Sequence, residues 1–307
     1  MSASPPELGG SDRIRSVAFI GYGELADALA RGLTGTGIEL YAYVRHRDDS
    51  AAADARHARI RSAGVHLCPT IGAAVGAADA VIAAVPAASA IEVIDACAHY
   101  LRPGQLYVDP SSSLPEVKRD GAERVGQAGS EYADVAVLGT VVSAGARVPM
   151  LASGNGARRW GEEASAAGLN VTVLEGPPGA AALVKLLRSV FMKGRDALVL
   201  EMVLAARRHG VLDAVLSSIG GAGEQVPFSN LAERVMCSLA VYAERRADEL
   251  ADAAYLLQQA GVDPVMTRAG EARLRLLAES GLRDRFGGER PRELSEVLGC
   301  LDELAAV

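Results

Sequence analysis

The sequence has few potential metal ligands, and these are scattered. Its four cysteines form no C-x-x-C pair, and its five histidines are equally dispersed. Structural metal sites need Cys or His ligands at short, regular spacing, so we expect no metal site. Isolated cysteines are typical of reduced thiols in a reducing compartment, and we therefore expect a cytoplasmic protein.

The chain also lacks the features of a nucleic-acid or membrane protein. Its net charge is −7 and it contains no long basic run, so we expect no nucleic-acid partner. Its most apolar stretch, residues 78–94, is interrupted by Asp79, Pro86 and Glu92, which favours a buried strand and helix over a membrane span. Residues 1–12 are polar and rich in Pro, Gly and Ser, and we expect a disordered leader without a signal peptide.

Lysine is rare in this sequence compared with arginine. Of 31 Lys and Arg residues, only Lys118, Lys185 and Lys193 are lysines. Where any cation would serve, the chain mostly uses arginine, so each lysine is a candidate for a role that needs an amine. Genome composition alone could produce the same bias.

Predicted strands and helices alternate over the first 174 residues. Short apolar runs predict strands at 15–20, 38–44, 65–67, 80–85, 105–109, 131–137, 148–153 and 170–174. Amphipathic segments between them predict helices at 25–33, 51–64, 71–77, 87–100, 114–127 and 156–167. This alternation predicts βαβ units and a mostly parallel sheet that is covered on both faces.

The character of the sequence changes after Gly176. Helical patterns cover residues 180–209, 211–219, 228–261, 263–280 and 291–306, with almost no strand signal. We therefore predict an α/β fold with an N-terminal Rossmann domain (13–176). An all-α C-terminal substrate and dimerisation domain (177–307) follows, joined by a long interdomain helix. An apolar helix of 30 residues needs more cover than one small domain supplies, so we expect a homodimer.

A glycine-rich turn lies between the first predicted strand and helix. It reads Gly21-Tyr22-Gly23-Glu24-Leu25-Ala26 and matches G-x-G-x-x-A. The first glycine permits a tight turn, the second lets the backbone approach a pyrophosphate, and the small third position lets the helix pack on the strand. The helix N-terminus then presents free N–H groups to the anion. The turn predicts a dinucleotide-binding site.

The end of the second predicted strand selects the cofactor. An acidic residue there would bind the ribose hydroxyls of NAD, but Val44 is followed by Arg45, and the first carboxylate is Asp48. The guanidinium of Arg45 could pair with a 2′-phosphate, so we expect NADP. NAD is the alternative if these arginines only form a solvated loop.

Two further loops follow predicted strands and should face the ligands, because ligands bind beyond the carboxyl ends of parallel strands. Val85 and Pro86 end one strand and are expected to contact the cofactor. Ser111, Ser112 and Ser113 follow Asp109, and their hydroxyls could donate to a substrate carboxylate or bracket the nicotinamide. The serines could instead cap the next helix.

Four motifs carry a resemblance to a known family. They are G-Y-G-E-L-A at 21–26, V-D-P-S-S-S-L-P at 108–115, D-V-A-V-L-G-T at 134–140 and G-P-P-G-A-A-A-L-V-K-L-L-R-S at 176–189. The chain resembles the 6-phosphogluconate dehydrogenase and β-hydroxyacid dehydrogenase superfamily over nearly its whole length. It is most similar to a poorly characterised branch with V-P-x-L-x-S-G, R-R-A-D-E-L and A-G-V-D-P-x-M-T-R motifs, here at 148–154, 245–250 and 260–268.

The resemblance implies that Lys185 is the catalytic residue. Lys185 stands in an apolar run, and a partly desolvated lysine has a lowered pKa and can exchange a proton near neutrality. An arginine could not, because it does not deprotonate. Lys185 could instead be a lysine that snorkels from a helix edge. Lys193, about 80° further round the helix, is a weaker candidate.

The sequence departs from the family at two substrate-binding positions. Ser189 stands where the family has an asparagine, and Leu138-Gly139-Thr140 replaces S-G-G. The resemblance thus leaves hydride chemistry in place but puts the usual β-hydroxyacid substrates in doubt. Arg188 could bind an extra acidic group of a substrate or lie on the surface.

We therefore expect an NADP-dependent oxidoreductase that transfers a hydride between the nicotinamide and a small anionic hydroxy or oxo acid. Lys185 would be the general acid/base, and Ser111, Ser112, Gly139, Thr140 and Ser189 would position the substrate. The alternatives are an imine or enamine reductase on the same scaffold and a non-catalytic NADP-binding sensor.

Overall fold

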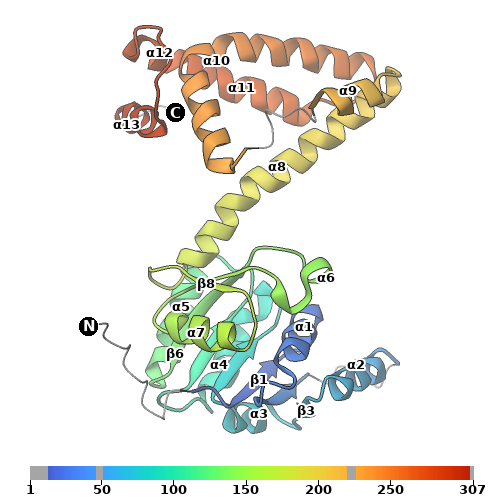
Figure 1. The fold of residues 1–307 in the computed structure, drawn as a ribbon, viewed down its shortest axis with the longest axis vertical. Coiled ribbons are helices and arrows are strands. Elements are labelled where there is room, and N and C mark those ends of the chain that lie inside the picture. Colours follow the sequence, from blue (N-terminus) through green and yellow to red (C-terminus); the bar gives the residue numbers. More distant parts are fainter. Residues whose placement is uncertain (1–12, 46–50, 220–225, 305–307) are drawn as a thin grey trace, which may run out of the picture. The chain divides into compact units, whose positions relative to one another are not determined.

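The computed structural model describes residues 13–45, 51–219 and 226–304 (Figure 1). These residues form two compact units, the first ending at Arg188 and the second beginning at Ser189. The expected leader at 1–12 lies outside the described residues, as do His46 and Arg47.

The first unit is built on one eight-stranded sheet. Its strands are β1 (Ser16–Ile20), β2 (Glu39–Tyr43), β3 (His66–Leu67), β4 (Ala80–Ala83), β5 (Leu106–Asp109), β6 (Glu131–Val137), β7 (Met150–Ser153) and β8 (Val171–Val173). Their order is β3-β2-β1-β4-β5-β6-β7-β8, and every pair is parallel except β6–β7. The chain reverses its direction across the sheet between β1 and β4, which is the switch point where doubly wound folds bind ligands.

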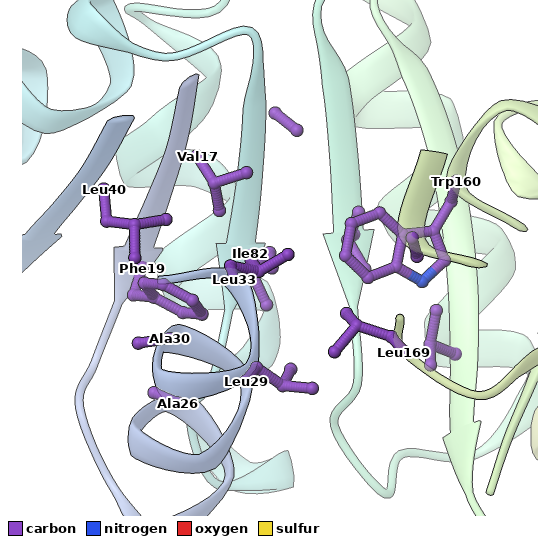
Figure 2. Close-up of a cluster of buried hydrophobic side chains, with 14 of the residues drawn as sticks. Val17, Phe19, Ala26, Leu29, Ala30, Leu33, Leu40, Ile82, Trp160 and Leu169 are labelled. Atoms are coloured by element: carbon purple, nitrogen blue, oxygen red, sulfur yellow. The ribbon is translucent and has the colours of Figure 1, made fainter. Parts of the chain in front are cut away.

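Helices cover both faces of this sheet, because the strands alternate their side chains between two cores. The helices are α1 (Glu24–Leu33), α2 (Ala51–Ser62), α3 (Ile71–Ala77), α4 (Ala90–Ala98), α5 (Pro115–Gln127), α6 (Val141–Ala144) and α7 (Ala157–Ala166), with 3₁₀ turns η1 (Ala87–Ser89) and η2 (Gly145–Arg147). On one face, Phe19 packs with Leu29 of α1, and Trp160 of α7 belongs to the same cluster (Figure 2). On the other, Ile20 packs in a second cluster with Ile94 of α4 and Val125 of α5.

The second unit is all helical among its described residues. It contains most of α8 (Ala180–Arg208), then α9 (Leu212–Ile219), α10 (Phe228–Gln259), α11 (Val265–Glu279), α12 (Leu282–Arg285) and α13 (Leu294–Glu303). Helix α10 bends where Tyr242 leaves helical geometry. The buried carboxylate of Glu201 accepts hydrogen bonds from Met266 N (2.7 Å) and Thr267 N (3.1 Å), so α8 caps the start of α11.

The predicted fold class is confirmed: a Rossmann domain with a mostly parallel sheet precedes a helical region. The first compact unit runs to Arg188 rather than ending at the expected boundary of 176. Two backbone N–H groups at the start of α8, those of Gly179 and Ala182, donate to Asp134 of β6, so the first turns of α8 pack with the sheet. Helix α6 and turn η2 were not predicted from the sequence.

None of the helices in the described parts of the chain is both long and apolar enough to cross a membrane. Within the same residues, no group of three or more His, Cys, Asp or Glu side chains could hold a metal ion.

Candidate functional site

The glycine turn after β1 lies at the switch point and requires glycine at its first position. Gly21 has φ +83° and donates its N–H to Tyr43 O (2.9 Å). A Cβ on Gly21 would lie 2.7 Å from the carbonyl oxygen of Ala84, just after β4. Only glycine permits both the positive φ and the close approach of these two strand ends.

The second glycine of the turn leaves the start of α1 open to a ligand. Gly23 is the N-cap residue of α1, makes no side-chain cap, and has no atom within 4 Å of where a Cβ would lie. The first backbone N–H groups of a helix are free to bind an anion, and the helix dipole favours a negative charge there. The turn therefore fits the pyrophosphate of a dinucleotide.

A pocket of about 290 Å³ lies beside this turn. It brings together four residues that the sequence assigned to the cofactor, namely Gly21, Arg45, Val85 and Pro86. Its other lining residues are Ile20, Tyr43, Ile71, Ser89, Val93 and Ala96, which the sequence analysis missed. Ile71 and Ser89 each follow a loop after a strand of the parallel sheet, so the strand-end rule could have indicated them.

Arg45 lies at the rim of this pocket. Its guanidinium forms an ion pair with Glu92 of α4 (2.5 Å), and both side chains are about half exposed. Exposed ion pairs contribute about 0–1 kcal/mol, so a phosphate could displace Glu92 at little cost. A second guanidinium, that of Arg59 in α2, donates to Tyr22 O in the glycine turn (3.4 Å). The sequence analysis missed Arg59 because it lies far from the turn in the chain.

The serine loop after β5 meets Lys185. The Nζ of Lys185 donates to Ser112 Oγ at 2.7 Å, although 73 residues separate the two. Ser111 and Ser113 are buried and hydrogen-bond to each other through their hydroxyls (2.9 Å). The N-cap residue of α5 is Leu114, which makes no side-chain cap, so the alternative that the serines cap this helix is wrong. Ser112 is therefore the exposed hydroxyl of the loop, held against the lysine.

Lys185 is half-buried in the first turns of α8. Desolvation by burial lowers the pKa of Lys185, and the positive charge of Lys118 lowers it further, while the carboxylate of Asp134 raises it. An amine in such surroundings exchanges its proton more readily at neutral pH than an exposed lysine does. The pair of Lys185 and Ser112 can thus hold and move a proton at the oxygen or nitrogen of a bound substrate.

Lys118 is a charged residue in the core that the sequence analysis left without a role. Its side chain is fully buried, and its Nζ donates to Asp109 O (2.8 Å) and lies 3.1 Å from Asp109 Oδ1 and 3.4 Å from Asp134 Oδ1. The spacing of Lys118, Gly121 and Val125 places all three on the buried face of α5. That i, i+3, i+7 pattern was the signal that could have identified Lys118 as a core residue.

The remaining predicted substrate residues have other contacts. Thr140 is the N-cap residue of α6, and its Oγ1 hydrogen-bonds to Ser143 Oγ. A Cβ on Gly139 would meet Pro149 and Val148 at 3.3 Å. These contacts do not join Gly139 and Thr140 to the Lys185 pair. Ser189 is the first residue of the second unit, four positions after Lys185 on α8.

The comparisons with known proteins agree with this geometry. Residues 16–160 match the NAD-binding domain of 6-phosphogluconate dehydrogenase, and residues 206–277 match a domain of unknown function (DUF1932). A conserved hypothetical protein from Sinorhizobium meliloti 1021 is 29% identical, with 85% of this chain and 87% of that chain covered and a TM-score of 0.58.

Two other solved structures share the fold. The conserved protein MTH1747, of unknown function and structurally similar to 3-hydroxyacid dehydrogenases, is 28% identical, with 89% and 99% of the two chains covered and a TM-score of 0.59. The imine reductase from Myxococcus stipitatus, in complex with NADP⁺, is 18% identical, with 93% and 99% covered and a TM-score of 0.70. At that identity the likeness shows the fold alone.

The glycine turn, its pocket and these matches define residues 16–160 as a domain similar to the NAD-binding domain of 6-phosphogluconate dehydrogenase. The resemblance noted in the sequence is confirmed.

Proposed function

We propose that this protein is an NADP-dependent oxidoreductase that interconverts a small anionic hydroxy acid and the corresponding oxo acid. The observation that carries the proposal is the hydrogen bond from Lys185 Nζ to Ser112 Oγ, because Ser112 follows β5 at the same edge of the parallel sheet as the glycine turn that follows β1. When bound, the nicotinamide supplies or accepts the hydride.

The proton chemistry then falls to Lys185. In the oxidative direction the neutral amine accepts the hydroxyl proton of the substrate as the C–H bond breaks. In the reductive direction the ammonium donates that proton to the forming alkoxide. Ser112 fixes the position of the amine, and the desolvation that lowers the pKa of Lys185 brings its loss of a proton closer to neutral pH.

The specificity for NADP is supported by Arg45. Its guanidinium lies at the rim of the pocket beside the glycine turn, and its present partner, Glu92, is exposed. The planar guanidinium of Arg45 could bind a 2′-phosphate at this rim. The residue before Arg45 is Val44, which has no carboxylate to bind the 2′-hydroxyl of NAD. NAD remains the weaker cofactor of the two.

A substrate panel tests the function. Purified protein is mixed with NADPH and a series of 2-oxo acids, 3-oxo acids and cyclic imines, and nicotinamide absorbance is followed. Turnover of an oxo acid supports the proposal. Turnover of imines alone would make the protein an imine reductase, and binding of NADPH with no turnover of any compound would favour a sensor.

We further propose that the protein acts as a homodimer in the cytoplasm. A groove of about 700 Å³ lies among α8, α9, α10 and α11, lined by apolar side chains such as Phe191, Leu198, Met202 and Leu257. Large apolar exposed patches mark association surfaces, and a second copy of the long apolar helix α8 has the matching character. The four cysteines are free thiols, as expected in a reducing compartment. Sedimentation as a monomer at micromolar concentration would contradict the dimer.

A further inference from the structure

The buried charges beneath the serine loop connect the two halves of the proposed proton-transfer pair. Asp109, Lys118 and Asp134 come from β5, α5 and β6, and each is at most 1% exposed. Burying charged groups is costly unless each is paired, and three in one place are rarely retained for stability alone. Their partners indicate what they do.

Asp109 holds the serine loop. Its Oδ1 accepts the N–H of Ser111 (2.9 Å), its Oδ2 accepts the hydroxyl of Tyr132 (2.6 Å), and its carbonyl oxygen accepts from Lys118 Nζ. All the polar atoms of Asp109 that face the core are thus engaged by neighbours. The loop that carries Ser112 therefore leaves the sheet in one fixed direction.

Asp134 holds the start of α8. Its Oδ2 accepts the backbone N–H groups of Gly179 (3.1 Å) and Ala182 (3.0 Å), and also the hydroxyl of Ser153 (3.2 Å). The hydroxyl of Ser153 in turn accepts the N–H of Ala181 (2.9 Å). Lys185 follows Ala182 by less than one helical turn, so this anchor fixes the position of its backbone.

Lys118 joins the two anchors, because its ammonium lies between Asp109 and Asp134. Helix α5 also contacts the turn before α8 directly, since a Cβ on Gly179 would lie 2.7 Å from Pro115 O. We propose that Asp109, Lys118 and Asp134 form a positioning cluster that sets both the geometry and the electrostatic surroundings of the Lys185–Ser112 pair. This inference rests on the proposed function of Lys185.

Two members of the positioning cluster shift the pKa of Lys185 in opposite directions. Among the described residues, Lys118 from α5 lowers the pKa of Lys185 and Asp134 from β6 raises it. Asp109 of β5 faces Lys118, and Arg188 follows Lys185 on α8 itself. A purely structural cluster would destabilise the fold when altered but would not move the protonation of Lys185 in opposite directions.

The small number of lysines allows a direct test that needs no substrate. The chain has three, of which Lys118 is fully buried and Lys193 is exposed. Competitive acetylation with acetic anhydride across a pH series, read peptide by peptide by mass spectrometry, gives the midpoint of protonation of Lys185. In the wild type this midpoint should fall below that of a lysine in an unstructured peptide, and an ordinary midpoint would overturn the inference.

Two isosteric variants and one matched control separate charge from structure. In Lys118→Met the Lys185 midpoint should rise by about half a pH unit or more, and in Asp134→Asn it should fall. Tyr132→Phe removes a hydrogen bond of the same cluster without changing its charge, so it should lower the melting temperature but leave the midpoint in place. The Lys193 profile should be the same in all four proteins.

The outcomes also distinguish this inference from the proposed function. If the Lys185 midpoint moves in the same direction in folded Lys118→Met and Asp134→Asn, or does not move, the proposed positioning role of the cluster is wrong. This holds whether or not Lys185 is needed for turnover. Opposite shifts in a protein whose Lys185→Met variant keeps full turnover would uphold the cluster and overturn the proposed function. If one of the two charge variants fails to fold, the direction in which the Lys185 midpoint moves in the other still decides.

Discussion

Replacing Gly21 with alanine should damage both the fold and cofactor binding. Gly21 has φ +83°, where an L-residue costs roughly 1–2 kcal/mol. Its new Cβ would also lie 2.7 Å from Ala84 O and 2.9 Å from Val85 Cγ1, and relieving such overpacking costs about 1–3 kcal/mol more. We therefore expect a total loss of roughly 2–5 kcal/mol in the free energy of unfolding.

The chain offers a matched control for this variant. Gly35 has the same φ of +83°, but nothing lies within 4 Å of where its Cβ would be. Gly35→Ala should therefore lose only the strain of roughly 1–2 kcal/mol, with normal cofactor binding. Gly21→Ala should additionally weaken NADPH binding tenfold or more, because the two strand ends must move apart beside the pocket.

Denaturant unfolding and a fluorescence titration with NADPH measure the two quantities. Gly21→Ala should be less stable than Gly35→Ala and should bind NADPH more weakly. Equal stability of the two variants, together with wild-type affinity of Gly21→Ala for NADPH, would refute the close packing at the switch point as the reason for this glycine.

Three further variants test separate parts of the structure. Arg45→Ala should weaken NADPH binding about 10- to 150-fold and leave NADH binding unchanged in parallel titrations, since a phosphate–guanidinium contact contributes about 1.5–3 kcal/mol. Equal losses for both cofactors would mean that Arg45 does not meet the 2′-phosphate. Ser112→Ala should lower turnover about tenfold and leave NADPH affinity intact in steady-state assays, because it removes only the hydrogen bond that orients Lys185. Unchanged turnover would show that Ser112 does not position Lys185. Glu201→Gln should lower the free energy of unfolding by about 1–2 kcal/mol in a denaturant titration, because it weakens the hydrogen bonds that cap the start of α11. A variant as stable as the wild type would show that this cap contributes little.

The periodicity of the sequence was sufficient to predict most of the fold. Continuous apolar runs such as 16–20 and alternating helical patterns predicted the sheet of the first unit and the helices of the second. The direction of β7 could not be predicted, because the alternation of side chains along a strand is the same in parallel and antiparallel pairs. The short helix α6 and turn η2 have too few residues for a periodic pattern.

The candidate site was predictable where it follows strand ends and not where it depends on long-range packing. Gly21, Arg45, Val85 and Pro86 follow parallel strands, and the structure brings them to one pocket. The roles of Lys118 and Asp134 depend on contacts with residues 9 to 48 positions away in the chain, and a helical lysine is usually a solvated residue. Composition marked Lys118 as a rare lysine and its helical spacing was compatible with the buried face of α5, but only packing shows that it lies between Asp109 and Asp134.

The proposed function depends on proton transfer by Lys185 during hydride transfer. The most direct measurement is the single-turnover rate of hydride transfer in wild type, Lys185→Met and Lys185→Arg, with NADPH affinity measured in parallel. We expect a rate loss of about 10²–10⁴-fold in both variants with unchanged affinity, because neither side chain can exchange a proton near neutral pH. We also expect wild-type oxidation to accelerate and reduction to slow as pH rises through the lowered pKa of Lys185. Wild-type rates in Lys185→Met, or the same pH dependence in both directions, would contradict this role of Lys185.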